Sequence, residues 1–370
     1  MKPSCNNSRV VHGISAGPIG AGRSGRGPVA GCVGPCQVAR SRCKWRVFCA
    51  TRWLCLRTHL YNECVPFRHV SSKRADQRLT ERRNPASTNL DRLSAEAIVR
   101  LMNREDSKIA TAVAREIRSI ARAVDAIVHS IQRGGRLFYV GAGSSGRLGV
   151  LDAAECAPTF GTSRKLVQAL IAGGRRAVTN AVEGAEDLVR NGELDLRAKK
   201  LTPKDVVIGI AASGTTPYVL GALKYARKCK ATTVAVTANR NMPVARIAKI
   251  LIAPEVGPEV LTGSTRLKAG TAQKMVLNML STAAMVRLGH AYENLMIDLL
   301  DTNEKLSERS VRILAEASGK DLSAAKHALR QSGHNLRVAL VMLKKKVDAP
   351  SAKLMLKTSM GNLRLALGES

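Results

Sequence analysis

The segment Arg136-Leu-Phe-Tyr-Val-Gly-Ala-Gly-Ser-Ser-Gly-Arg147 joins a short apolar run to a loop of small residues. Such a pattern is typical of a buried β-strand that ends in a turn and leads into a helix. The pattern recurs downstream, where each apolar run again precedes a turn and a helical stretch: Leu166 to Ala172, Asp205 to Ala211, Thr232 to Val236 and Ile250 to Ile252. Strands that alternate with helices need crossover connections. We therefore predict a doubly wound α/β fold with a mostly parallel sheet.

Upstream of the first strand, apolar residues recur at steps of three and four from about Ser94 to Gln132. This period predicts helical structure in front of the sheet. The chain has 370 residues, 45% of them hydrophobic. That length and composition suffice for one large core and a smaller module.

The first 75 residues differ in composition from the rest of the chain. They hold thirteen Lys or Arg and one acid, Glu63, together with seven of the nine cysteines. They show no sustained period of 2 or 3.6 residues, so no regular helix or strand is predicted. An Arg-rich, acid-poor leader also suits a transit peptide, but the Pro, Gly and Cys content suits an amphipathic targeting helix badly. We interpret residues 1–75 as a disordered basic leader that need not belong to the working protein.

The net charge of +31 suggests nucleic-acid binding, because Lys and Arg displace counterions from a phosphate backbone. Outside the leader, however, the basic residues are scattered among acids, and the sequence has no zinc-finger spacing, RNA-binding aromatic motif or basic-region zipper. No apolar stretch reaches the ~18 to 20 residues that a membrane span needs. Only Cys156 and Cys229 lie outside the leader, which fits a reducing compartment. We expect a cytoplasmic protein that binds neither nucleic acid nor membranes.

Two loops lie where a doubly wound sheet binds its ligands, beyond the carboxyl ends of strands and at helix N-termini. The first spans Gly141 to Arg147, and the second runs from Ala212 to Pro217. Small residues let backbone N–H groups approach an anion, hydroxyls add donors, and the helix dipole favours negative charge. Each loop is also compatible with a plain strand-to-helix turn. We predict a phosphate-binding site formed by Ser144, Ser145, Gly146, Ser213, Gly214, Thr215 and Thr216.

The first loop also matches the G-x-G-x-x-G pattern of dinucleotide-binding folds. Such a fold places an Asp or Glu about 20 residues later, at the end of the next strand, where it binds ribose hydroxyls. Here that strand ends in Leu170-Ile-Ala-Gly-Gly174, which contains no acid. A phosphate monoester on a sugar suits the hydroxyl-rich loops better, and we expect no nicotinamide cofactor.

Three glutamates are candidates for acid–base chemistry. Glu155 is expected to close the helix after the first loop, and Glu183 and Glu186 are three residues apart in Ala181-Val-Glu-Gly-Ala-Glu-Asp187. On a helix that spacing would place both acids on one face. The alternative for each glutamate is a solvated surface position. Cys156 is a poor candidate for a nucleophile because no histidine motif accompanies it, and a small buried thiol is the better interpretation.

The longest motif is Gly141-Ala-Gly-Ser-Ser-Gly-Arg-Leu-Gly-Val-Leu-Asp-Ala-Ala-Glu-Cys156, which resembles the signature of the N-acetylmuramic acid 6-phosphate etherases. The resemblance covers the chain from about residue 80 to the C-terminus and is supported by three further segments: Glu81 to Ser87, Ala181 to Asp187 and Gly257 to Thr271. It implies a sugar-isomerase fold, a homodimer with active sites near the subunit interface, and no metal or organic cofactor.

The resemblance also implies a domain organisation and site residues. We expect residues 76–302 to form the α/β domain with its N-terminal helices, and residues 303–370 to form a small C-terminal helical module. This module would resemble a three-helix ubiquitin-associated domain near Leu322 to Lys346. By motif match, Glu155 corresponds to the proton donor of the family and Glu186 to its second catalytic acid. Further substrate-site candidates in the matching segments are Glu183, Ser264, Arg266 and Lys268.

Three positions depart from the family pattern. Ser144 stands where relatives usually carry Thr, Ala157 replaces a proline, and Thr215 replaces an arginine common in the second loop. A charge-assisted contact to an anion is worth about 1.5 to 3 kcal/mol. We therefore expect the missing arginine to affect substrate preference or rate.

The reaction implied by the resemblance removes D-lactate from C3 of a phosphorylated amino sugar. The opened sugar has an aldehyde that acidifies the C2 proton, so a base can remove this proton and an acid can protonate the departing lactate before water adds at C3. Two alternatives stay open. A sugar-phosphate isomerase uses the same fold and the same C2 proton, and a sugar-phosphate sensor like the glucokinase regulatory protein binds a partner without catalysis. The two retained glutamates favour an enzyme.

Overall fold

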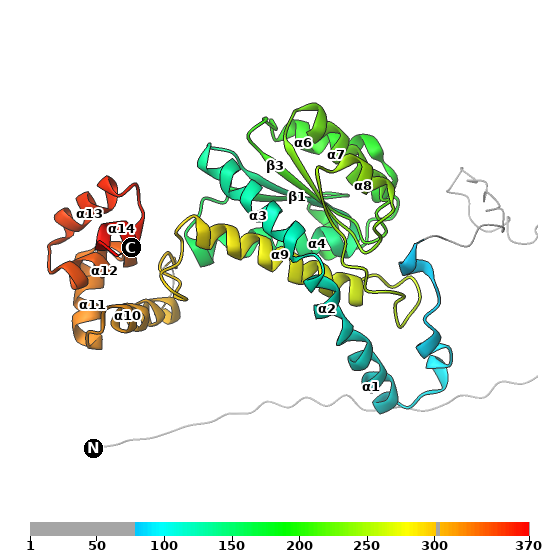
Figure 1. Ribbon diagram of the computed structural model, residues 1–370, viewed down its shortest axis with the longest axis horizontal. Helices are drawn as coiled ribbons and strands as arrows, with labels where there is room; N and C mark the ends of the chain where they lie inside the picture. Colours follow the sequence, from blue (N-terminus) through cyan, green and yellow to red (C-terminus); the bar gives the residue numbers. More distant parts are fainter. Residues whose placement is uncertain (1–77, 301–303, 370) are drawn as a thin grey trace, which may run out of the picture. The chain divides into compact units, whose positions relative to one another are not determined.

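Five parallel strands form one sheet in the order β2-β1-β3-β4-β5 (Figure 1). The computed structural model describes residues 78–300 and 304–369, so the interpretation of residues 1–75 as a leader lies outside the described residues. In chain order the strands are β1 (Leu137–Gly141), β2 (Val167–Ile171), β3 (Val206–Ile210), β4 (Thr232–Val236) and β5 (Ile250–Ile252). The predicted doubly wound parallel fold is confirmed, and each predicted strand agrees with the structure to within one residue at either end.

The order of the strands reverses between β1 and β3. β2 lies on one side of β1 and β3 lies on the other. β1 and β3 pair in parallel with Gly141 opposite Ile210, so their following loops leave the same edge of the sheet side by side. Ligands of doubly wound sheets bind at such a reversal. The fold therefore places the two predicted phosphate loops next to each other.

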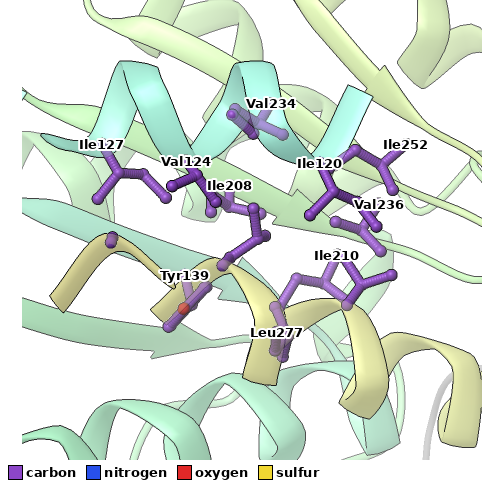
Figure 2. Close-up of a cluster of buried hydrophobic side chains, with 14 of the residues drawn as sticks. Ile120, Val124, Ile127, Tyr139, Ile208, Ile210, Val234, Val236, Ile252 and Leu277 are labelled. Atoms are coloured by element: carbon purple, nitrogen blue, oxygen red, sulfur yellow. The ribbon is translucent and has the colours of Figure 1, made fainter. Parts of the chain in front are cut away.

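Helices cover both faces of the sheet, because successive strand residues point to opposite sides. Tyr139 and Ile208 face the layer shown in Figure 2, where Ile127 and Leu277 pack against them. The helices that contribute to this layer are α2 (Lys108–Ala114), α3 (Ile117–Gln132), α4 (Gly143–Phe160) and α9 (Lys268–Arg287). The opposite face is covered by α6 (Val189–Ala198), α7 (Pro217–Lys228) and α8 (Pro243–Ile247).

The predicted helical stretch from Ser94 to Gln132 is three helices rather than one. α1 (Ala95–Asp106) begins where expected, because the Ser94 side chain accepts a hydrogen bond from the backbone N–H of Ala97. α1 ends at Asp106, with Ser107 as its C-cap, and α2 ends before Glu116, which leaves the helical conformation with φ of −99° and ψ of 2°. The Glu116 carboxylate is buried and forms an ion pair with Arg240. A tertiary contact thus accompanies the second break, and the local apolar period does not encode it.

Residues 304–369 form five helices, not three, and Tyr292, Ile297 and Leu299 belong to the same hydrophobic core as these helices. These are α10 (Glu304–Ser318), α11 (Leu322–Gln331), α12 (Leu336–Lys345), α13 (Ala349–Thr358) and α14 (Leu363–Leu367). Asp321, Asn335, Asp348 and Asn362 each cap the following helix by accepting a backbone N–H. The segment predicted as a three-helix core, Leu322 to Lys346, contains only α11 and α12.

Two further features of the described residues concern helix length and the free thiols. No helix within residues 78–300 and 304–369 is long and apolar enough to span a membrane. Cys156 and Cys229 are both free thiols, and burial raises the pKa of Cys156 to about 12. Cys156 therefore stays protonated at neutral pH, as expected for a small buried thiol and not for a nucleophile.

Candidate functional site

The first predicted loop closes tightly onto the end of β1. Gly143 starts α4 with a φ of 51°, a left-handed conformation that glycine adopts without strain. A Cβ on Gly146 would lie 2.9 Å from the carbonyl carbon of Gly141 and 2.6 Å from the Ile171 side chain. The two glycines therefore let the N-terminus of α4 approach the sheet edge, where its backbone N–H groups and dipole favour an anion.

In the second predicted loop, Thr215 donates twice to Ser213. The backbone N–H and the hydroxyl of Thr215 lie 3.2 and 3.0 Å from Ser213 Oγ. A serine hydroxyl has two acceptor lone pairs and one proton. Both lone pairs of Ser213 are used, so its own proton is left for an incoming acceptor. Gly214 has a φ of 72°, and α7 begins directly afterwards at Pro217, a residue that the first helical turn tolerates.

The Ser145 hydroxyl in the first loop donates a hydrogen bond to Gln273, a residue that the sequence did not mark as a candidate. Its Oγ lies 3.0 Å from Oε1 of Gln273, which belongs to α9 and is 128 positions away in the chain. Gln273 is buried, with only 2% of its surface exposed. α9 therefore contributes directly to the position of the first loop.

Glu183 and Glu186 share a pocket of 170 Å³ with the first loop. Ala142, Gly143 and Arg147 are among the other residues that line it. The expectation that both acids lie on one helix is wrong, since Glu183 lies before Gly184, which has a φ of 70°, and only Glu186 belongs to the short 3₁₀ helix η4 (Ala185–Asp187). The turn nevertheless brings both acids to the same pocket.

Arg147 ties this acidic segment to α4. Its Nε lies 3.0 Å from the carbonyl oxygen of Val178, and its Nη2 lies 2.8 Å from the carbonyl oxygen of Asn180. Val178 lies near the end of the short helix α5 (Arg176–Thr179), and Asn180 directly follows this helix, just ahead of Glu183. The guanidinium group can make both contacts at once because its donors form a rigid fork. Arg147 thus fixes the distance between the first loop and the two acids.

Glu155 lies apart from the loops of its own chain. It is exposed on α4, twelve residues beyond Gly143. At 1.5 Å per residue, this places it about 18 Å further along the helix axis, and it does not line the pocket of Glu183 and Glu186. α4 also continues to Phe160, so Glu155 does not close the helix. A single chain therefore does not bring Glu155 and Glu186 to one reacting centre.

The three candidates at and just before the start of α9, Ser264, Arg266 and Lys268, differ in their surroundings. Lys268 is buried, and its Nζ lies 2.7 Å from Oε2 of Glu105. Its backbone N–H and that of Ala269 donate to the Glu259 carboxylate at 3.0 and 2.9 Å, which caps α9. Ser264 is half-buried and Arg266 is exposed. None of the three candidates lines the pocket of Glu183 and Glu186.

Metal ligands do not gather at this site. Over the described ranges, no group of three or more His, Cys, Asp or Glu side chains could hold a metal ion. The pocket joins the start of α4 and the Arg147 guanidinium group to two carboxylates, which suits anion binding and proton transfer. The predicted phosphate residues Ser144, Ser145, Gly146, Ser213, Gly214, Thr215 and Thr216 do not line this pocket.

Comparison with known proteins identifies the family. The SIS domain family matches residues 182–283, and the glucokinase regulatory protein N-terminal SIS domain matches residues 119–227. N-acetylmuramic acid 6-phosphate etherases of Pectobacterium atrosepticum and Clostridium beijerinckii are 53% and 51% identical to the chain over 289 and 290 residues, which is 78% of this chain and 95% of each relative. The chain belongs to the N-acetylmuramic acid 6-phosphate etherase family. The resemblance inferred from the sequence motifs is confirmed.

Among solved structures, phosphoheptose isomerase GmhA from Neisseria gonorrhoeae aligns with a TM-score of 0.41 and 16% identity over 52% of this chain and 98% of that chain. So distant a likeness has no bearing on function. The etherase relatives alone assign the family.

Three residues of this etherase-family chain escaped sequence reasoning: Arg147, Gln273 and Glu105. Arg147 stands inside the longest motif, yet its role depends on two carbonyl groups that only the fold brings near. Gln273 lies two residues after the motif that ends at Thr271, so this motif could have marked it as a candidate. Glu105 lies in α1 among other charged residues, and no sequence motif marks it.

Proposed function

We propose that this chain cleaves the D-lactyl ether of N-acetylmuramic acid 6-phosphate during recycling of cell-wall amino sugars. The products are N-acetylglucosamine 6-phosphate and D-lactate. The observation that carries the proposal is the pocket in which Glu183 and Glu186 meet the first loop, in a chain about half identical to etherases. This cleavage is a carbon–oxygen lyase reaction. The aldehyde of the opened sugar itself acidifies the C2 proton, so we assign the reaction no metal or organic cofactor.

The substrate phosphate binds at the reversal point of the sheet. Ser144, Ser145 and Gly146 surround it at the start of α4, and Ser213, Gly214, Thr215 and Thr216 surround it at the start of α7. The backbone N–H groups of Gly146 and Gly214 already donate to the carbonyl oxygens of Ala142 and Ala211 at 3.1 and 3.0 Å, so these two glycines give the phosphate room and are not donors. Ser213 supports this assignment because its proton is free to donate. Fixing the phosphate holds the sugar in the geometry that proton transfer needs.

Glu186 is the base that removes the C2 proton. It lines the pocket beside the first loop, within the span of a sugar whose phosphate is bound there. Glu183, in the same pocket, is a substrate-site residue that binds sugar hydroxyls. A positioned base of this kind contributes typically ~10² to 10⁴-fold to the rate.

The proton donor is Glu155 of the partner subunit in a homodimer. Within one chain, the distance along α4 keeps Glu155 from the loops, whereas a second copy can bring its own α4 to the site. The exposed side of α4 carries Leu151, which is 45% exposed, one turn before Glu155. An apolar residue beside a catalytic acid suits a face that a second copy covers. Glu155 protonates the lactate as it leaves and then activates the incoming water.

Thr215 compensates in part for the missing arginine of the second loop. Its hydroxyl occupies one lone pair of Ser213 and so leaves the Ser213 proton free to donate to the phosphate. The exchange supplies a hydroxyl group but lacks the positive charge of arginine. Substrate affinity below that of arginine-bearing relatives follows from this difference.

Ser264 and Arg266 lie in a segment whose Gly263 N–H donates to the carbonyl oxygen of Thr80 at 3.2 Å. We assign them to the rim of the substrate site, and we assign Lys268 a structural part because Glu105 already binds its ammonium group. The reaction takes place in the cytoplasm, which suits the two free thiols.

The match to the glucokinase regulatory protein SIS domain favours one alternative, a sensor that binds a sugar phosphate without changing it. Incubating the purified protein with N-acetylmuramic acid 6-phosphate and measuring D-lactate separates these functions. An etherase releases lactate in proportion to substrate consumed, whereas a sensor binds the sugar and releases none. Glu186→Gln should abolish release. Asp187→Asn, which changes a neighbouring exposed acid outside the pocket, is the matched control.

A further inference from the structure

Only one of the two polar atoms of the Gln273 side-chain amide has a hydrogen-bond partner among the described residues. Its Oε1 lies 3.0 Å from Ser145 Oγ, while its Nε2 is buried and has no hydrogen-bond partner within the part of the chain that the structure describes. A buried amide donor without a partner loses its hydration without compensation. The arrangement around Ser145 therefore stores an unfavourable contact next to the first loop.

The same arrangement blocks Ser145 as a phosphate donor. A serine hydroxyl has one proton, and the contact with Oε1 uses it. Ser213 in the opposite loop differs, because it accepts twice from Thr215 and keeps its proton free. The two serines thus lie in loops that follow the neighbouring strands β1 and β3, and they have opposite hydrogen-bond states.

A half-turn of the Gln273 amide group gives Nε2 a partner and frees the Ser145 proton. It also moves Oε1 into the buried position that Nε2 held, so a ligand that accepts from Ser145 can decide between the two orientations. Rotation about the terminal bond exchanges Oε1 and Nε2 with little change in shape, and the two atoms are distinguished only by their hydrogen-bond partners. Nε2 then donates to a lone pair of Ser145 Oγ at the position that Oε1 holds. The Ser145 proton is released toward the loop, where Ser145 becomes equivalent to Ser213.

We propose that Gln273 is a positioning residue that sets the direction of the Ser145 proton, and that binding of a phosphate monoester turns its amide so that Ser145 donates to the ligand. This inference rests on the phosphate site of the proposed function. Gln273 itself does not touch the ligand, since it is buried and acts through Ser145.

Three variants test the coupling with inorganic phosphate and N-acetylglucosamine 6-phosphate as probes, by calorimetry on the full chain. Gln273→Met keeps the length of the side chain and removes both hydrogen-bond groups. Gln273→Glu keeps the shape but, when ionised, only accepts, so it holds the Ser145 proton away from the ligand. Ser145→Ala removes the hydroxyl. Gln331→Met, on an exposed position of α11, controls for the type of substitution.

We expect Gln273→Glu to weaken phosphate binding about tenfold, with KM for the etherase substrate raised and kcat nearly unchanged. Gln273→Met removes the acceptor that holds the Ser145 proton and should bind phosphate as tightly as the parent protein or more tightly. In the Ser145→Ala background, Gln273→Glu should have no further effect, because the residue acts only through that hydroxyl. Additive effects of Ser145→Ala and Gln273→Glu would overturn the proposal, as would unchanged affinity in Gln273→Glu.

The design separates this inference from the proposed function. If Ser145→Ala leaves phosphate affinity unchanged, the phosphate site itself is misplaced. If Ser145→Ala weakens binding and Gln273→Glu matches the parent protein, the site stands and the role of Gln273 fails. Thermal unfolding of each variant identifies any that does not fold, and the near-isosteric Gln273→Glu then decides the question alone.

Discussion

Lys268 and Glu105 form a buried ion pair, with 2.7 Å between Nζ and Oε2 and at most 4% of either side chain exposed. The pair joins α1 to the start of α9. Asn84 donates to the same carboxylate oxygen at 3.0 Å, so the N-terminal segment is fastened to the same point. The residues that lead into the first helices are thereby held against the helix that carries Gln273.

Lys268→Met should destabilise the protein by about 3 kcal/mol, because it leaves the Glu105 carboxylate buried with part of its partners removed. Urea unfolding measures the loss. Lys108→Met is the matched control, since Lys108 contacts the same carboxylate but is 60% exposed, and it should cost less than about 1 kcal/mol. Adding Glu105→Gln to Lys268→Met should restore part of the loss. Equal effects of the two lysine variants would show that burial does not matter here.

Glu105 also predicts a pH dependence of stability. Burial alone would raise its pKa, but hydrogen bonds from Lys108, Lys268 and Asn84 outweigh burial and lower the pKa from 4.5 to about 2. A lowered folded-state pKa contributes stability above the unfolded value, and this contribution is lost as pH falls from about 4.5 toward 2. The free energy of unfolding of the parent protein should therefore exceed that of Glu105→Gln most above pH 4.5, and the gap should shrink in acid. A gap that stays constant with pH would contradict the assignment.

Ser145→Ala and Ser213→Ala should each weaken substrate binding by about 1 to 3 kcal/mol, because each removes a donor to the phosphate. Calorimetry with N-acetylglucosamine 6-phosphate gives the affinities. Ser163→Ala changes an exposed serine away from the loops and should leave them unaltered. Parent-like affinity in both loop variants would mean that the phosphate binds elsewhere.

The two catalytic glutamates can be assigned by isotope exchange. Glu155→Gln should stop lactate release but still exchange the C2 proton with deuterated solvent, because proton removal precedes departure of the ether oxygen. Glu186→Gln should lose both activities. Mass spectrometry of recovered substrate and a lactate assay report the two steps. The opposite pattern would mean that the acid and the base are interchanged.

Mixing the two inactive variants tests whether the site spans two subunits. In a dimer formed from one Glu155→Gln chain and one Glu186→Gln chain, one site combines an intact Glu186 with an intact Glu155 from the partner. Statistical exchange between isologous dimers should then restore about a quarter of parental activity. Unfolding and refolding the variants together, with each refolded alone as the control, gives the measurement. Activity that never rises above the separate variants would place both glutamates of a working site in one chain.

The sequence determined the sheet and its two loops because those features are local. A strand or helix is set mainly by the periodicity of neighbouring residues, and each strand was located to within one residue. The loops 143–146 and 213–216 were recognisable because their glycines and hydroxyls follow a strand directly. The four motifs also gave the family, since long exact segments rarely match by chance.

Tertiary packing decided which side chains meet. Gln273 contacts Ser145 across 128 positions, and Lys268 contacts Glu105 across 163, so no local period relates the members of either pair. Glu183 and Glu186 face one pocket through a left-handed glycine and not through a helix face. Glu155, which the motif placed with them, lies far along α4 because a helix advances only along its axis. Residue types and spacing determined which groups could act, and the packing of helices onto the sheet determined which of them come together.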